Sequence, residues 1–192
     1  MTEDLKVGEK IKLLREKRKL SLPDLAQKSG FSSAVLSQIE NHMISPPLGT
    51  IIKLAKALEV EPGYFFKEKP KSHYVIVRKD ERMSVSRVAS KDGVSYGYSY
   101  ESLGADKKGR KMEPFVVTLD PETVKPVSQS SHDGEEFIFV LEGEMLVTLG
   151  DHSDVLAPGD SIYYDSTIPH RVGAKGSAPA KILAVLWTGA TK

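Results

Sequence analysis

Residues 21–41 read SLPDLAQKSGFSSAVLSQIEN and contain the start and end signals of two short helices. Ser21 is a favoured N-cap residue, with a proline and an aspartate in the turn that follows, and Gly30 is placed to end that helix. Ser32 can cap a second helix that runs to Glu40. Two short helices joined by a tight turn are the layout of a helix-turn-helix unit, whose second helix enters the major groove of DNA.

Apolar residues repeat at helical spacing on both sides of this stretch, from Leu5 to Phe66. An earlier block over 7–14 and a later block over 48–58 each place their apolar side chains on one face. A last short helix is expected to end near Phe66 and to close the core. The N-terminal part is therefore predicted to be an all-helical domain of four or five helices.

The pattern changes after the charged run KEKPK at 67–71. Beyond it, short segments of β-branched and aromatic residues alternate with a period near two and are separated by Gly, Pro, Asp or Ser. The expected strands cover 74–78, 83–88, 94–100, 115–119, 137–141, 145–149, 161–164 and 182–187. Many short strands at even spacing indicate a sandwich or barrel. We therefore expect a helical domain over 1–68, a linker over 69–74 and an all-β domain over 75–192.

Composition narrows the class of protein further. The chain has 192 residues, 40% hydrophobic and 28% charged, and no apolar run near the roughly 18 residues that a membrane helix needs, so no membrane association is expected. Its first ten residues carry charges of both signs instead of the apolar core of a signal peptide, and it has no cysteine. These features indicate a cytoplasmic protein. The net charge is +1, with the helical part slightly basic, which agrees with DNA binding there.

Residues 14–60 resemble the five-helix domain of the lambda-type phage repressors and the XRE-like regulators, and the resemblance extends over about 5–66. It implies a buried charge pair between Arg15 and Glu40. The core positions of the family are matched by Leu25, Ala26, Val35, Leu36, Ile39, Leu54 and Leu58. An alternative interpretation is that the helices pack against another protein and present only a solvated face.

The same resemblance implies which residues meet DNA. The residues expected at base edges are Ser33, Ala34, Ser37 and Gln38, and those expected near phosphates are Ser32 and Asn41. Gln38 is the main candidate, because glutamine can bond adenine through N6 and N7 together. Leu22 stands where such repressors often begin their second helix with a polar residue, so one phosphate contact is expected to be missing.

Residues 130–172, SSHDGEEFIFVLEGEMLVTLGDHSDVLAPGDSIYYDSTIPHRV, resemble the paired motifs of the cupin family. This resemblance implies a double-stranded β-helix, or jelly-roll barrel, with an internal pocket. His132 and Glu136 fall on the ligand positions of the first motif, and His170 falls on that of the second. Ser130 stands where the first motif has another histidine.

Two readings of this pocket remain open. In the first, His132, Glu136 and His170 hold a divalent metal such as Zn, Fe, Mn or Ni, because two histidines and one carboxylate form a workable facial set. In the second, the pocket is free of metal and binds an organic effector, because the Ser130 hydroxyl is a poor ligand in place of imidazole. In both, the expected effector pocket contains Ser130, His132, Glu136, Tyr164 and His170.

Together these features predict a transcriptional regulator that is not an enzyme. Its expected partners are double-stranded operator DNA, a small-molecule effector and a second copy of the chain, because one reading helix makes too small an interface for specific binding. One alternative is a cupin enzyme, an isomerase or a metal-dependent dioxygenase, with the helices as an accessory. Another is a regulator whose effector is the metal ion itself.

Overall fold

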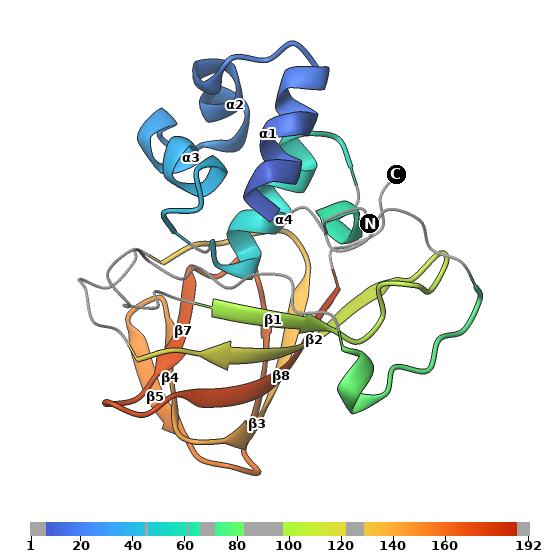
Figure 1. Cartoon of the computed structure of the whole chain (residues 1–192). Coiled ribbons are helices and arrows are strands. Elements are labelled where there is room, and N and C mark those ends of the chain that lie inside the picture. Colours follow the sequence, from blue (N-terminus) through green and yellow to red (C-terminus); the bar gives the residue numbers. More distant parts are fainter. Residues whose placement is uncertain are drawn as a thin grey trace.

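The structure is a computed structural model and describes residues 7–44, 46–60, 62–65, 72–82, 98–121 and 129–187. A helical unit lies over one end of a β-barrel (Figure 1). None of the helices in these ranges has both the length and the apolar character needed to cross a membrane.

The helices begin and end at the residues that the sequence indicates. Their bounds are α1 Val7–Lys17, α2 Leu22–Ser29, α3 Ser33–Glu40 and α4 Leu48–Ala57. The Ser21 hydroxyl accepts a hydrogen bond from the Asp24 backbone, and the Asp24 carboxylate accepts one from the Ser21 backbone, forming a capping box. Gly30 ends α2 in the left-handed conformation with φ 76°, and Ser32 caps α3 by accepting from the Val35 N–H. The predicted caps are confirmed.

The expectation of five helices is wrong, because the described residues contain four α-helices. The last expected helix is a single 3-10 turn, η1 (Pro62–Phe65). Pro62 has no backbone N–H to donate and Gly63 is a weak helix former, so this segment does not extend into an α-helix. Phe65 is nevertheless buried in the helical core, as the last helix was expected to achieve.

Buried aliphatic residues and one charged pair hold the helices together. The Arg15 Nε atom lies 2.7 Å from Glu40 Oε1, and Nη2 lies 2.9 Å from Oε2. Arg15 Nη1 also donates to the Leu20 carbonyl at 2.8 Å. The pair is buried and bidentate, so it ties the end of α3 to α1, and the predicted contact is confirmed. The surrounding apolar core is formed by Ile11, Leu25, Leu36, Ile39, Ile51, Leu54, Leu58 and Phe65.

Two antiparallel sheets form the barrel. Its strands are β1 Tyr98–Ser102, β2 Met112–Leu119, β3 Glu135–Glu142, β4 Met145–Leu149, β5 His152–Leu156, β6 Ser161–Asp165, β7 His170–Ala174 and β8 Ala180–Trp187. One sheet has the order β1-β2-β8-β3-β6 and the other β5-β4-β7. Strand β8 therefore pairs with both β2 and β3, which are not its neighbours in sequence.

The sequence pattern predicted one strand that is absent and missed two that are present. Residues 74–78 are unpaired, with Tyr74 and Ile76 exposed, so the strand expected there is wrong. Strand β5 was missed because its residues are mainly polar, and β7 because it is short and contains a glycine. The expected strand 83–88, most of 94–100 and part of the expected linker 69–74 lie outside the described residues.

Alternation along the strands gives each sheet an inner and an outer face. On β3, Glu136, Ile138 and Val140 are buried in the barrel, whereas Phe137 is exposed on the outside, as the pattern predicts. The inner faces of the two sheets pack against each other in one apolar core. Glu136 is a carboxyl group within that core, so it requires polar partners there.

Candidate ligand pocket and DNA-reading helix

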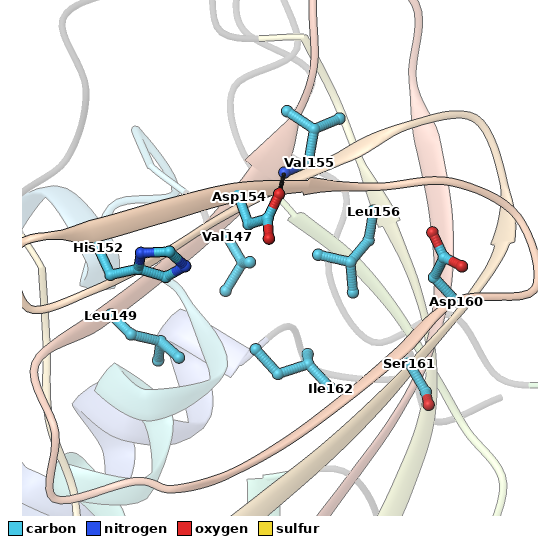
Figure 2. A pocket seen from close by; sticks show the side chains of 9 residues that line it. All are labelled: Val147, Leu149, His152, Asp154, Val155, Leu156, Asp160, Ser161 and Ile162. Carbon is cyan, nitrogen blue, oxygen red and sulfur yellow. Dashed lines mark hydrogen bonds between the residues drawn. The ribbon is translucent and has the colours of Figure 1, made fainter.

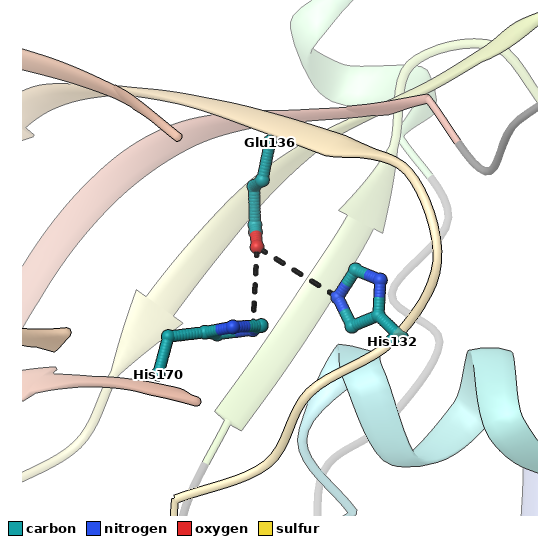
Figure 3. Close-up of side chains that lie close together, drawn as sticks. All are labelled: His132, Glu136 and His170. Carbon is teal, nitrogen blue, oxygen red and sulfur yellow. Dashed lines mark ion pairs between the residues drawn. The ribbon is translucent and has the colours of Figure 1, made fainter. Parts of the chain in front are cut away.

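Three titratable side chains converge inside the barrel next to the helical unit (Figure 3). Glu136 comes from β3, His170 begins β7, and His132 lies on the segment that leads into β3. The Glu136 Oε2 atom is 3.8 Å from His170 Nε2 and 4.0 Å from His132 Nε2. All three side chains are buried. The structure thus brings together the three residues that the sequence singled out as a candidate metal set.

Backbone carbonyls orient both imidazole rings. His170 Nδ1 lies 2.8 Å from the Ile168 carbonyl, and His132 Nδ1 lies 3.1 Å from the Asp133 carbonyl. Because a carbonyl can only accept, each Nδ1 carries the proton, and each Nε2 presents a lone pair toward Glu136. His132 Nε2 is buried and has no hydrogen-bond partner within the described residues. This is the tautomer that a metal ligand requires.

Burial shifts the pKa values of all three groups toward their neutral forms. Desolvation raises the pKa of Glu136 to about 7, although the Tyr164 hydroxyl donates to its Oε2 at 2.7 Å and opposes that shift. Desolvation also lowers the pKa of His132 to about 4 and lowers that of His170. The imidazole–carboxyl distances are those of ion pairs, but the imidazoles are neutral at pH 7. The contacts are therefore polar rather than ionic at that pH.

Ser130 lies beside the triad, although it is not a strong ligand. Its backbone exchanges two hydrogen bonds with the backbone of His170, of 3.0 and 2.9 Å. These bonds fix the serine next to the strand that carries the histidine. The residues that the sequence assigned to an effector pocket therefore lie in one region of the barrel.

The roof of this pocket is the first turn of α4. A cavity of about 40 Å³ remains between that turn and the barrel interior. It is lined by Pro47, Leu48 and Gly49 from the helical unit and by barrel residues that include Tyr98, Tyr100, Glu136, Tyr164 and His170. At roughly 10–15 Å³ for one water, the cavity holds a few waters or an ion. Little room is left for an organic effector while α4 is in this position.

Gly49 makes this close approach possible. A Cβ atom at this position would lie 2.8 Å from His132 Cδ2 and 3.2 Å from the Ser130 hydroxyl oxygen. The backbone of α4 therefore lies directly on the side chains that line the candidate metal site.

Tyr100 on β1 supplies the N-terminal cap that α4 lacks in its own chain segment. Pro47 is the N-cap residue and makes no side-chain capping bond. Instead the Tyr100 hydroxyl donates to the Pro46 carbonyl at 3.2 Å and accepts from the Leu48 N–H. Burial raises the pKa of Tyr100 well above its usual value, so the hydroxyl keeps its proton. An exposed ion pair between Lys56 and Asp133 adds a second link between helix and barrel.

A larger cavity of about 340 Å³ lies elsewhere, at the open edge between β4, β5 and β6 (Figure 2). Its floor is apolar, formed by Val147, Leu149, Leu156 and Ile162, and Asp154 and Asp160 lie on its rim. The Asp154 carboxylate accepts from the Val155 N–H and that of Asp160 from the Ala157 N–H, so both have local partners. The smaller pocket is the candidate ligand site, because the convergent titratable groups are there.

The residues expected to read DNA lie along α3 and its ends. Ser32, Ala34, Gln38 and Asn41 are exposed, whereas Ser33 and Ser37 are half-buried. Asn41 donates to the Ser37 carbonyl at 2.9 Å and to its hydroxyl at 3.3 Å, so it also caps the end of the helix. Gln38 is exposed on this helix, at the position that the sequence made the main candidate.

Comparison with known proteins defines the class. Residues 11–65 match the helix-turn-helix family and residues 115–186 match the cupin domain family. The chain therefore consists of an XRE-like helix-turn-helix domain followed by a C-terminal cupin domain. It is 27% identical over 184 residues to the HTH-type transcriptional regulator PuuR of Escherichia coli (strain K12), and 95% of each chain is covered.

Two further relatives indicate different functions for this architecture. A solved HTH_3 family transcriptional regulator from Vibrio cholerae has a TM-score of 0.64 and 28% identity, with 96% of each chain covered. The (S)-2-hydroxypropylphosphonic acid epoxidase of Streptomyces wedmorensis is 36% identical over 119 residues, which is 58% of each chain. A structure of Fe(II) HppE covers 97% of this chain and all of its own, with a TM-score of 0.51 and 28% identity. The architecture therefore occurs both in regulators and in an enzyme.

Sequence reasoning missed the residues that join the two domains. Gly49 was not selected, although a glycine in the first turn of a helix disfavours the helix and signals a close approach. Tyr100 gave no such signal, because a tyrosine in a strand has a sufficient explanation in packing.

Proposed function

We propose that this protein is a sequence-specific DNA-binding transcriptional regulator whose cupin domain binds a small-molecule effector. The observation that carries the proposal is the position of α4. Its first turn belongs to the DNA-binding domain and also covers the candidate ligand pocket. A regulator requires that ligand binding and domain position depend on each other, and this contact supplies that dependence.

The size of the pocket indicates how an organic effector would act. The cavity of about 40 Å³ leaves little room for an organic molecule, so we infer that such an effector binds better when α4 moves away from His132. A ligand that binds one arrangement better than another shifts the population toward it. The effector therefore favours a position of the helical domain different from the one described here.

Movement of α4 would carry the reading helix with it. Leu25 of α2, Leu36 of α3 and Leu54 of α4 are fully buried in one helical core, and the Arg15–Glu40 pair ties α3 to α1. The helices are therefore expected to move as one body on the barrel. In a homodimer, which we also propose, this movement changes the spacing of two reading helices on a palindromic operator.

A protein that binds operator DNA works where the DNA is, so we also propose a cytoplasmic location.

A divalent metal fits the residues present. His132 has a buried Nε2 atom without a partner in the described chain, His170 presents an Nε2 of the same tautomer, and Glu136 supplies a carboxylate. A bound ion would act as a Lewis acid that anchors a carboxylate or hydroxyl group of the effector. Zn, Fe, Mn and Ni all accept this ligand set. With Ser130 in place of a third imidazole, we propose weak metal binding and an organic effector as the main signal.

A metal-dependent enzyme is the second candidate, because Fe(II) HppE shares this fold at 28% identity over nearly the whole chain. In that case the triad would hold iron, and α4 would close the pocket over a substrate. The two functions differ in what the helical domain does. A regulator binds an operator through Gln38, whereas an enzyme leaves that residue without a role.

Binding to DNA from upstream of the protein's own gene tests the proposal by fluorescence anisotropy. We expect affinity to fall steeply between about 50 and 200 mM salt, because phosphate contacts release counterions. Gln38→Ala should weaken binding by roughly 5- to 150-fold, as expected for loss of a bidentate base contact. Gln129→Ala, the same substitution in the barrel, is the matched control. Absence of salt-sensitive binding to any such fragment would overturn the proposal.

Metal analysis separates the two readings of the pocket. The wild-type chain and the His132→Ala/His170→Ala variant are purified without chelator, and their bound metal is measured by mass spectrometry. More metal in the wild type supports a metal anchor. Equal and negligible contents in both would establish a metal-free pocket.

A further inference from the structure

The outer face of the five-stranded sheet has an apolar centre where β6, β3 and β8 lie side by side. The register places Tyr163, Phe137, Val185 and Pro114 in one uncharged row across β6, β3, β8 and β2. The next row on the same face contains Phe139 and Leu183 between Ser161 and the buried Val116. The row on the other side contains Trp187 and Met112 together with the acidic residues Glu135 and Asp165. We call the set Tyr163, Phe137, Val185, Pro114, Phe139, Leu183, Trp187 and Met112 the aromatic face. An antiparallel sheet with one face toward water normally carries polar residues on it, so this face requires an explanation.

Four side chains of the aromatic face are open to solvent. Tyr163 is 65% exposed, Met112 57%, Trp187 39% and Phe137 36%. At roughly 200 Å² for a fully exposed large side chain, these four fractions amount to about 400 Å² of apolar surface. A standard interface buries about 800 Å² on each partner, so these side chains supply about half of one, before their half-buried neighbours are included. These four side chains can therefore form the centre of an interface, and their neighbours on the face must supply the rest of its area.

The other outer surfaces of the barrel differ in chemistry. The opposite sheet pairs Thr148 with Ser153 and with Arg171 on its outer face, so polar groups interrupt it. The open edge between β5 and β6 carries Asp154 and Asp160. Two copies joined there would bring like charges together, which is unfavourable. On the aromatic face, Glu135 and Asp165 lie in the row of Trp187, and the Tyr163 hydroxyl donates to the Glu135 carboxylate, while Glu142 and Lys181 form an ion pair at the opposite rim. The uncharged row of Tyr163, Phe137, Val185 and Pro114 is therefore the part of the face on which two copies can meet.

The position of the face relative to the helical domain matters as much as its composition. The helical domain lies over one end of the barrel (Figure 1), so the outer faces of both sheets look sideways. A two-fold axis that runs along the barrel toward the helices can join two aromatic faces. It then leaves both helical domains at the same end of the dimer. That is the arrangement required to place two reading helices on one palindromic operator.

We propose that the aromatic face is the surface through which two copies of this chain form a dimer. The inference rests on the proposed function, because the need for two reading helices is what selects a second copy as the occupant. Aromatic anchors dominate such interfaces, so Tyr163, Phe137 and Trp187 supply most of the affinity.

Sedimentation analysis of the full chain over a range of concentrations tests the surface. We expect a dimer for the wild type and at least about 30-fold weaker dimerisation for Tyr163→Lys/Trp187→Lys, the usual effect of removing interface anchors. Val155→Lys, an exposed apolar residue on the other sheet, and Tyr74→Lys, outside both sheets, should leave the dimer intact. Circular dichroism confirms that each variant is folded. A monomeric wild type, or a double variant that dimerises as well as the wild type, would overturn the proposal that the aromatic face is the dimer interface.

The absence of cysteine from the chain allows a second test that introduces no charge. Val185→Cys lies near the centre of the aromatic face and should give a disulfide-linked dimer on mild oxidation. Val155→Cys should not. Linkage at Val155→Cys without linkage at Val185→Cys would contradict the proposal. Operator binding is measured on the same samples, so that failure of the proposed surface can be told apart from failure of the proposed function. A wild-type protein that dimerises through another surface and still binds DNA would refute the surface and leave the function intact.

Discussion

Gly49 of α4 and His132 of the barrel approach each other so closely that a Cβ atom on the glycine would lie 2.8 Å from the imidazole Cδ2. The imidazole has little freedom to retreat, because its Nδ1 is bonded to the Asp133 carbonyl at 3.1 Å. Gly49→Ala should therefore lower the free energy of unfolding by about 1–3 kcal/mol, the usual cost of overpacking. The helix propensity of alanine would otherwise raise it by about 1 kcal/mol. Urea unfolding monitored by circular dichroism measures the difference.

Removal of the imidazole provides the matching control for that prediction. In a His132→Ala background the added methyl group meets no ring, so Gly49→Ala should become stabilising by about 1 kcal/mol. A reversal of sign between the two backgrounds locates the strain at this contact. If Gly49→Ala stabilises the wild-type chain as well, α4 does not lie on His132 in solution.

Tyr100→Phe should loosen the contact between α4 and the barrel. The substitution removes a buried hydroxyl that bonds the Pro46 carbonyl and the Leu48 N–H, at a cost of about 1–3 kcal/mol. Hydrogen exchange should then become faster in the first turn of α4. Tyr98→Phe is the control, because its hydroxyl bonds the Val172 carbonyl at 2.6 Å within the barrel. Equal exchange in α4 for both variants would show that Tyr100 does not cap the helix.

Glu40→Ala should destabilise the helical domain severely. It removes the bidentate partner of the buried Arg15 guanidinium and leaves the exposed Glu16 carboxylate, 3.6 Å away, as the remaining anion. Loss of one member of a buried pair costs about 3–5 kcal/mol. Glu59→Ala breaks the exposed pair with Arg18 and should cost no more than about 1 kcal/mol. Thermal unfolding compares the two. Arg15→Met/Glu40→Leu should recover much of the loss, and failure to recover would indicate a role of the pair beyond its own charges.

The buried Glu136 carboxyl should make stability depend on pH. Its folded pKa is raised from 4.5 to about 7, so its contribution is fully present below pH 4.5 and is lost as the pH rises through 7. The pKa of His132 is lowered from 6.5 to about 4, so its contribution is present above pH 6.5 and lost as the pH falls through 4. Over the pH range in which both groups titrate, Glu136 lowers the stability as the pH rises, whereas His132 raises it.

Glu136→Gln isolates the carboxyl contribution, because the amide oxygen can still accept from Tyr164. On raising the pH from 4.5 to 7, the wild type should lose stability relative to this variant by on the order of 2–3 kcal/mol. Urea unfolding in the presence of a chelator measures the difference, since a bound metal would favour the ionised form. A constant difference across this range would show that Glu136 has an ordinary pKa.

The helical half of the fold could be predicted almost completely, because its signals are local. Ser21, Gly30 and Ser32 act within a few residues of themselves and mark the helix boundaries. The polar strand β5 could not be found this way, because its pairing with β4 is a tertiary contact and its residues have low strand propensity. The last helix was overestimated because Pro62 and Gly63 limit it to one turn.

The same difference between local and tertiary signals decides which parts of the candidate site could be predicted. His132, Glu136 and His170 could be selected because the resemblance to cupins fixes their spacing, and the structure brings them together. The position of α4 over these three residues could not be predicted, because nothing in the sequence places residue 49 next to residue 132. Such a contact depends on how two domains dock, and each domain pattern is complete without it.

The cap that Tyr100 provides for α4 also bears on how freely these two domains can be exchanged. Modular proteins are often treated as interchangeable parts, and chimeras are built by cutting between domains. Here a cut in the linker would separate a helix from the hydroxyl that completes its first turn. A barrel taken from a relative would have to bring its own tyrosine, or an equivalent donor and acceptor, to the same place. In this chain the first turn of α4 therefore belongs structurally to both domains.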